Sequence, residues 1–242
     1  MAKVFKIGDQ PLSISTISEI TATNTPIVLS VSAKKKIKDC RKYLDNKIAK
    51  SSEPIYGINT GFGALCNHKI SNKELAQLQK NLVLSHACGT GEEVPAEIVK
   101  IMLLLKVQSL AYGYSGVQLK TVERLTEMFN NEILPVVYQQ GSLGASGDLA
   151  PLAHMSLPLI GEGEVDIPGI YDNGHYKRRK SSRVLKEMNW KPIQLQSKEG
   201  LALLNGTQFM TAYGVWSLIK ARRVSYLADM ISSISLEAFD GN

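Results

Sequence analysis

The residues from Gly141 to Pro151 read Gly-Ser-Leu-Gly-Ala-Ser-Gly-Asp-Leu-Ala-Pro, and their types and spacing suggest a chemical reaction of the backbone itself. Because Gly147 has no β-carbon, its backbone nitrogen can approach the carbonyl carbon of Ala145 at low steric cost. Closing a ring with that bond would expel one water. Loss of the Ser146 hydroxyl as a second water would leave an exocyclic methylene. The product would be an electrophile, which no unmodified side chain supplies.

Two better-known glycine-rich motifs do not fit this stretch. A nucleophile elbow reads Gly-x-Ser-x-Gly, but Asp148 stands where the second glycine would be. The Gly-Lys pair that ends a phosphate-binding loop is not there either. Taken alone, the residues from Gly144 to Gly147 are also compatible with an ordinary, unmodified turn.

The longer run from Gly141 to His154 resembles the core motif of the histidine and phenylalanine ammonia-lyase family. In that family an Ala-Ser-Gly tripeptide cyclises and dehydrates into a methylidene-imidazolone prosthetic group (MIO). The resemblance assigns this group to Ala145, Ser146 and Gly147. It also implies that Asp148 helps to arrange the loop for cyclisation.

Three further residues occupy positions that matter in this family. Tyr56 begins Tyr-Gly-Ile-Asn-Thr-Gly-Phe-Gly and matches the loop tyrosine that acts as general acid or base. His86 matches the position that selects the substrate ring, since a histidine can hydrogen-bond a polar ring. Asn205 matches the asparagine that holds the substrate carboxylate or amine. Simpler interpretations are a tyrosine packed beside a turn and a histidine satisfied near a helix end.

A metal site is the competing interpretation for two of the histidines. Cys66 and His68, together with His86 and Cys88, would supply four ligands. The one-residue spacing is not a usual zinc pattern, and residues two apart on a helix point in different directions. We therefore expect no metal.

The composition is that of an ordinary globular protein: 242 residues, 44% hydrophobic and 21% charged. The net charge is +6, but the lysines are scattered or gathered in one helix, which indicates solvated faces and no nucleic-acid partner. The most apolar window, from Ile101 to Leu105, is flanked by Lys100 and Lys106 and is too short to span a membrane. Three cysteines and the lack of a signal peptide favour a reducing cytoplasm.

Helices should position these residues. Apolar spacings of three and four predict a helix from Ser32, with Ser32 as its N-cap and the lysines on its wet side. Ser71 and Glu74 form a capping-box pattern at the start of a helix that runs to His86. The remaining predicted elements are a short helix within an irregular arm over 1–31, helices over 95–112, 117–130, 149–160, 181–189 and 201–238, an extended piece over 136–138, and a hairpin over 163–177 that turns at Asn173-Gly174.

The resulting fold class is mainly α, with a few short strands. The resemblance implies an MIO-bearing N-terminal region over 1–200 and the first long helix of a central bundle over 201–242. That helix is apolar on most sides, so it should lie inside a bundle or a subunit interface. Family members are usually about twice this long, so only the N-terminal half of the pattern is present.

Within the family, the motifs are most similar to those of the histidine-specific members. The implied reaction converts L-histidine into trans-urocanate and ammonia in a cytoplasmic homotetramer. A tyrosine ammonia-lyase or aminomutase is the alternative, because His86 would also meet a phenol. The 242 residues could instead be an inactive piece, or one half of a split enzyme whose C-terminal partner half supplies the missing residues.

Overall fold

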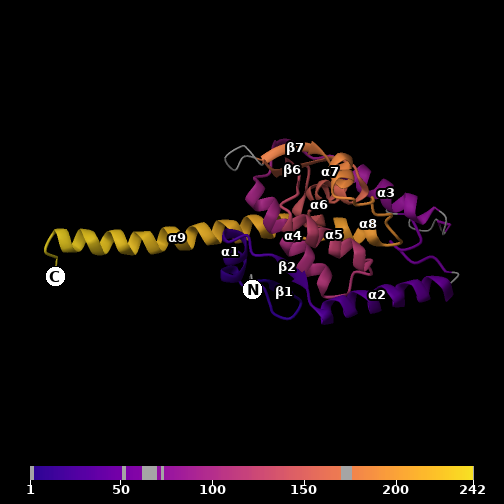
Figure 1. Ribbon diagram of the computed structural model, residues 1–242, viewed down its shortest axis with the longest axis horizontal. Coiled ribbons are helices and arrows are strands. Elements are labelled where there is room, and N and C mark those ends of the chain that lie inside the picture. The colour runs from indigo at the N-terminus through magenta and orange to yellow at the C-terminus, as the bar shows by residue number, and fades with distance from the viewer. Residues whose placement is uncertain (1–2, 51–52, 62–69, 72–73, 170–175, 242) are drawn as a thin grey trace.

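The computed structural model describes residues 3–50, 53–61, 70–71, 74–169 and 176–241. Helices make up most of it, and the strands are short, as the sequence predicted. One long helix, α9 (Gln208–Ala238), leaves the compact body and carries the C-terminus away from it (Figure 1).

The N-terminal arm is more regular than expected. It contains the predicted short helix, α1 (Ile14–Ala22), whose first turn is capped by Ser13: the Ser13 hydroxyl accepts from the Thr16 amide at 3.1 Å. Two strands flank the helix, β1 (Phe5–Ile7) and β2 (Ile27–Leu29), and they pair in parallel. Ile7 and Ile27 are completely buried, so their burial explains why this arm is ordered.

The second helix, α2 (Val31–Lys50), has the predicted amphipathic spacing, with Ala33, Ile37 and Leu44 buried on one face. The predicted N-cap is wrong by two residues. Ser30 caps the helix, because its hydroxyl accepts from the Ala33 amide at 3.1 Å. Ser32 is exposed in the first turn.

The third helix, α3 (Leu75–His86), ends where predicted but begins later. Ser71 and Glu74 do not form the reciprocal capping box, since the Ser71 hydroxyl donates to the Glu74 carboxylate at 2.6 Å instead of bonding a backbone amide. The amide of Leu75 bonds to the Ser71 carbonyl at 3.1 Å. The hydrogen bond between the two side chains therefore lies within the segment that precedes the helix.

The core is built around α4 (Ala96–Ala111), which follows Pro95 as predicted. Most of its residues are buried, and they include two lysines, Lys100 and Lys106. Helix α5 (Leu119–Asn130) packs beside it with a buried face of Val122, Leu125 and Phe129, among others. The buried apolar side chains of α4 and α5 form the central part of the hydrophobic core.

Two further small sheets are formed by short strands from later in the chain. Strand β3 (Thr90–Glu93) pairs with β5 (Tyr138–Gln140) in an antiparallel arrangement. The other sheet has the order β4 (Leu134–Pro135), β6 (Glu164–Pro168) and β7 (Tyr176–Lys180). The β6–β7 pairing confirms the predicted hairpin. Its predicted turn, Asn173-Gly174, lies outside the described residues.

The predicted helix over 149–160 consists of α6 (Leu149–Ser156) and a 3-10 turn, η3 (Leu157–Ile160). Helix α7 (Ser181–Glu187) matches the next prediction. In the described part of the chain, no helix has the length and apolar character needed to cross a membrane.

The single helix predicted over 201–238 is in fact two helices. Helix α8 (Glu199–Leu204) ends before α9 begins at Gln208. Asn205 takes an extended conformation (φ −78°, ψ 130°), and Gly206 has φ +147°, so neither can continue a helix. This break sets the geometry of the candidate site.

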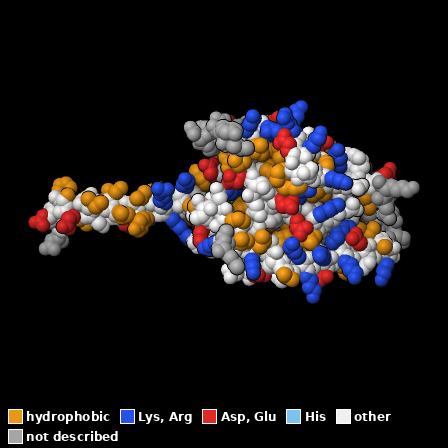
Figure 2. All heavy atoms as spheres, in the orientation of Figure 1, with side chains coloured by type: hydrophobic (Ala, Val, Ile, Leu, Met, Phe, Trp, Pro, Cys, Tyr) orange, Lys and Arg blue, Asp and Glu red, His pale blue; other side chains and the backbone are white. Residues whose placement is uncertain are grey.

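The first half of α9 packs on α4 and α1, whereas residues 220–241 are all exposed. Within α9, whose residues are all described, only Ala212 is buried. Apolar side chains gather along the projecting part of the helix (Figure 2). The burial expected for the whole helix is therefore not achieved by contacts with the described residues of this chain.

Candidate active site

The Ala145-Ser146-Gly147 segment folds into one tight turn. Residues Gly144–Ser146 form a 3-10 helix, η2, and the amide of Gly147 donates to the Gly144 carbonyl at 3.2 Å. Gly147 has φ +90°, a conformation that favours glycine. A β-carbon at Gly147 would lie 3.0 Å from the Gly206 carbonyl oxygen. Both the conformation and the close approach therefore require glycine here.

Side-chain and backbone contacts close the loop that carries this turn. The Ser142 hydroxyl donates to the Gly147 carbonyl at 3.1 Å. Gly141 has φ +125° and lies against the backbone of Gly89, where a β-carbon would approach the Gly89 Cα to 3.0 Å. Ala145 itself is exposed, so the turn is presented at the surface of this chain.

Asp148 links this loop to the break between α8 and α9. It is only 1% exposed, and its amide donates to the Gly206 carbonyl at 2.9 Å. Its Oδ2 atom accepts from the Met210 amide at 3.0 Å, in the first turn of α9. Its Oδ1 atom is buried and has no hydrogen-bond partner among the described residues. Asp148 thus connects the glycine-rich loop, which contains Gly147, to the α8–α9 break, which contains Asn205.

Asn205 lies in the break itself, with its side chain exposed. Its backbone carbonyl accepts a hydrogen bond from the Lys106 Nζ atom at 3.0 Å. Lys106 reaches this carbonyl from α4 and is only 1% exposed. Burial lowers the pKa of Lys106 to about 7, and the negative charge of Asp148 opposes that shift.

Lys106 is not among the residues predicted for this site, because in the sequence it stands out only as the polar flank of an apolar window. A signal was available. A lysine inside a helix that is apolar on every side must be buried, and a buried lysine needs a polar partner. The partner, a backbone carbonyl 99 residues away, could not be identified from spacing.

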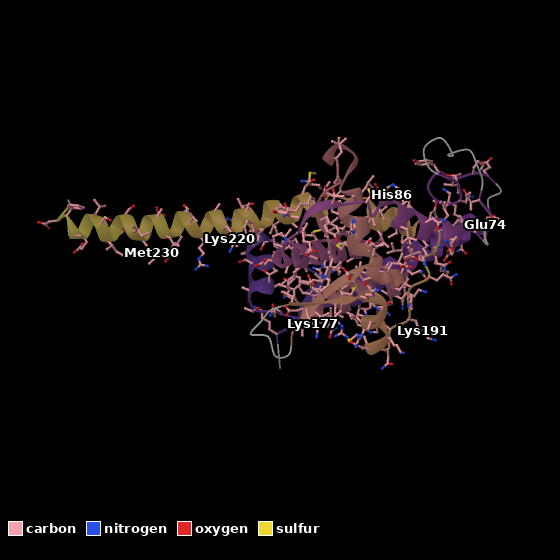
Figure 3. The ribbon with its side chains drawn as sticks, turned by 90° about the horizontal axis from the view of Figure 1, so that it is seen from above. Glu74, His86, Lys177, Lys191, Lys220 and Met230 are labelled. Carbon is pink, nitrogen blue, oxygen red and sulfur yellow. The ribbon has the colours of Figure 1, made fainter. Side chains whose placement is uncertain are left out.

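His86 is the last residue of α3, and its ring is half-buried. Its Nδ1 atom lies 2.8 Å from the Leu82 carbonyl oxygen and 3.1 Å from the Ser85 hydroxyl. A carbonyl can only accept, so Nδ1 carries the proton in this contact, and Nε2 is the atom left to accept when the ring has one proton. The ring is thus satisfied on one side, as the simpler interpretation held, while Nε2 can still receive a ligand N–H or O–H. Helix α3 runs between the positions of Glu74 and His86 in Figure 3.

The segment after His86 connects α3 to the glycine-rich loop. The amide of Gly89 donates to the His154 Nε2 atom at 2.9 Å. His154 lies on α6 and packs edge-on against Tyr138, with ring centroids 5.1 Å apart. Burial lowers the pKa of His154, which favours the neutral ring that accepts this bond. This contact places the end of α3 next to the start of the loop at Gly141.

Tyr56 lies in a turn over 53–60 that is held by buried polar residues. Asn59 Oδ1 accepts from the Ile55 amide at 2.6 Å, and the Thr60 hydroxyl accepts from the Gly57 amide at 3.2 Å. The Tyr56 side chain is 61% exposed. Phe62 and Gly63, which complete the eight-residue motif, lie outside the described residues. The catalytic role of Tyr56 stays a prediction.

Cys66 and His68, the first half of the competing metal set, also lie outside the described residues. In the part of the chain that the structure describes, no three His, Cys, Asp or Glu side chains are grouped as they would be around a metal ion. Cys88 is exposed and free, two residues beyond His86.

The sequence profile described as aromatic amino acid lyase matches residues 12–242 of this chain. The chain belongs to the aromatic amino acid lyase family. Among curated members, it is 42% identical over 241 residues to the histidine ammonia-lyase of Caldanaerobacter subterraneus subsp. tengcongensis. It is 43% identical over 236 residues to that of Deinococcus radiodurans. These matches cover 100% and 98% of this lyase-family chain, but only 46% and 44% of the relatives.

Solved structures of the family have the same fold. Histidine ammonia-lyase from Trypanosoma cruzi superimposes with a TM-score of 0.87 at 33% identity, over 99% of this chain and 45% of that one. Tyrosine aminomutase from Streptomyces globisporus gives 0.86 at 29% identity, over 98% of this chain and 43% of that one. The present lyase-family chain therefore corresponds to less than half of the length of each of these proteins.

Proposed function

We propose that this chain is the prosthetic-group-bearing part of a histidine ammonia-lyase, which eliminates ammonia from L-histidine to give trans-urocanate. The observation that carries the proposal is the Ala145-Ser146-Gly147 turn, held against Gly206 by Asp148. The identity of 42% to histidine ammonia-lyases over the whole chain supports the choice of substrate.

The residues present fit an MIO group. Gly147 has φ +90°, and a β-carbon there would lie only 3.0 Å from the Gly206 carbonyl oxygen, so this position favours a residue without a side chain, as ring closure onto Ala145 requires. The group, if formed from Ala145, Ser146 and Gly147, would supply an electrophilic methylene. No metal is required for that chemistry.

The other site residues would bind and orient the substrate. Nε2 of His86 would accept a hydrogen bond from the N–H of the substrate imidazole, because Nδ1 is already engaged by the Leu82 carbonyl. The exposed side chain of Asn205 would hold the substrate carboxylate or amine. Tyr56 would move the proton from the β-carbon, as its place in the family motif implies. Positioning would lower much of the barrier, because this proton is weakly acidic.

The exposed half of α9 supports an assembled enzyme. Large apolar side chains such as Leu227, Ile231 and Ile234 are 43%, 62% and 67% exposed, which is typical of a surface covered by a partner. We propose that residues 201–242 form the first helix of a central bundle, with residues 1–200 as the prosthetic-group-bearing region. The bundle would be completed by C-terminal sequence or by further subunits of a cytoplasmic homotetramer.

Tests of this proposal use the chain alone and the chain co-expressed with the C-terminal segment of the Caldanaerobacter subterraneus enzyme. We expect an intact mass lower by two waters in at least the complemented protein, and production of urocanate, read by ultraviolet absorbance, only there. The chain alone is expected to be inactive. If the mass in both preparations is that of the unmodified chain, with no water lost, the proposal is contradicted.

Tyrosine is the alternative substrate, because a phenol O–H could also donate to His86 Nε2 and because tyrosine aminomutase shares the fold. The higher identity to histidine ammonia-lyases supports histidine. Turnover of tyrosine but not of histidine by the complemented protein would reverse the choice.

A further inference from the structure

Lys106 is a deeply buried charged side chain beside the candidate site. It is 1% exposed, among fully buried neighbours on α4 such as Leu103 and Val107. Placing an ammonium group there is costly unless it is hydrogen-bonded and faces an opposite charge. Its Nζ atom donates a hydrogen bond to the carbonyl of Asn205 at 3.0 Å. The side chain is therefore committed to the break between α8 and α9.

The opposite charge is that of Asp148, which is equally buried. Asp148 Oδ1 has no hydrogen-bond partner among the described residues. The interaction between the two charges favours the protonated state of Lys106, while burial lowers its pKa to about 7. Both residues contact the Asn205-Gly206 segment, Lys106 through the Asn205 carbonyl and Asp148 through the Gly206 carbonyl.

We propose that Lys106 is a positioning residue for both formation of the prosthetic group and substrate binding. It fixes the two-residue Asn205-Gly206 segment, whose two ends serve the two processes. The Asn205 end carries the side chain expected to bind substrate. The Gly206 end holds the amide of Asp148 at 2.9 Å and closes over Gly147. This inference rests on the proposed function.

The backbone reaction shows why a fixed peptide matters. Ring closure forms a bond between the Gly147 nitrogen and the Ala145 carbonyl carbon. The Ala145 oxygen leaves as water with the amide hydrogens of Gly147 and Ser146. Ser146 then loses its Cα hydrogen and its hydroxyl as a second water, which leaves a carbon–carbon double bond. Neither step needs an oxidant or a reductant, so the requirement is that Gly147 be held against Ala145.

Lys100 offers a matched control on the same helix. It is also nearly buried, at 6% exposed, and it bonds to Asn24 and Glu132 at a different part of the molecule. Lys100→Met would remove a buried ammonium group of the same kind without touching the Asn205-Gly206 peptide. A purely structural role for Lys106 would make K106M and K100M behave alike.

The experiment measures the fraction of folded chain whose mass is lower by two waters, in the preparation where the wild type matures. We expect K106M to mature at least about ten-fold less than K100M, the factor that loss of one charged hydrogen bond produces. Lys106→Arg, which keeps the charge and the donors, should mature more than K106M. Thermal melting followed by circular dichroism verifies that each variant is folded.

Equal maturation of folded K106M and K100M would overturn the inference while leaving the proposed function intact. If K106M does not fold, K106Q and K100Q take their places: K106Q keeps a donor but loses the charge, and we expect the same deficit relative to K100Q. Equal maturation of that pair also overturns the inference. A wild type that matures in neither preparation overturns the proposed function, and this inference with it.

Discussion

At the residue scale, Gly147 is the position where backbone conformation and chemistry coincide. Its φ of +90° and its contact with the Gly206 carbonyl leave no room for a side chain. The lack of a β-carbon also lowers the steric cost of bringing its nitrogen to the carbonyl carbon of Ala145. Glycine thus serves the local fold and the proposed ring closure together.

Gly147→Ala should therefore destabilise the chain by about 1–3 kcal/mol, because it forces an alanine into a strained conformation against a backbone oxygen. It should also prevent the loss of two waters. The matched control is Gly214→Ala in α9, where a β-carbon meets nothing within 4 Å. That change should stabilise the helix by roughly 0.5–1 kcal/mol. Urea denaturation of both variants checks the two signs, and equal effects would refute the role of Gly147.

The buried amine of Lys106 predicts a pH dependence of stability. Its pKa is lowered from 10.5 to about 7 in the folded chain, so the unfolded chain binds more protons between these values. The free energy of unfolding should therefore rise as pH increases from 7 towards 10. K106M should lose this contribution. Urea titrations of both proteins at pH 7 and pH 9.5 measure it, and an identical change with pH in both would contradict the assignment.

His154 predicts that stability also depends on pH at the acid end of the range. Its neutral Nε2 accepts from the Gly89 amide, and burial lowers its pKa below the usual 6.5. The stability that depends on this neutral ring is present above pH 6.5 and is lost as pH falls through the lowered pKa. His154→Gln should weaken this acid sensitivity. Thermal melts at pH 5 and pH 7.5 compare the two proteins, and the same acid-induced loss in both would exclude His154 as its source.

The elements show where local sequence was sufficient and where it was not. The apolar spacing of α2 predicted its buried face of Ala33, Ile37 and Leu44, because a surface helix needs only one periodic stripe. The helix predicted over 201–238 failed at Asn205-Gly206, since apolar residues on both sides masked a turn signal that glycine and asparagine provide.

The candidate site was likewise predictable from the sequence only in part. The Gly141–Asp148 loop could be located from its residue types, and the structure confirms that it is a glycine-dependent turn. Its partners could not be predicted, because Asp148 meets Met210 and Lys106 meets Asn205 across 62 and 99 residues of chain. Such contacts follow from tertiary packing and have no spacing signature. The parallel pairing of β1 and β2 was missed for the same reason.

The α8–α9 break makes a prediction at the element scale. Gly206 has φ +147°, and a β-carbon there would lie 2.1 Å from the Gln208 side-chain oxygen. The flexible Gln208 side chain can move aside, but an L side chain rarely adopts this φ, so Gly206→Ala should strain the backbone here and weaken the hydrogen bond from the Asp148 amide to the Gly206 carbonyl. We expect about 1–3 kcal/mol of destabilisation and reduced maturation. Urea denaturation and intact mass measure both, and a variant with wild-type stability and maturation would show that the break tolerates a side chain.

For the whole molecule, the projecting half of α9 predicts assembly. Ile231 and Ile234 are 62% and 67% exposed, so changing both to glutamate should alter the stability of the isolated chain by no more than about 0.5 kcal/mol. The same changes should prevent co-purification with the C-terminal segment, because they place charges in an apolar interface. Light scattering after size exclusion reports the complex. Unimpaired assembly of the double variant would locate the interface elsewhere.

The central claim is that Ala145, Ser146 and Gly147 rebuild their own backbone, and the mass of the peptide that contains them tests it most directly. We predict that this peptide, cut from the complemented protein, weighs two waters less than its sequence requires. A peptide of the unmodified mass, from protein shown to be folded and assembled, would contradict the account.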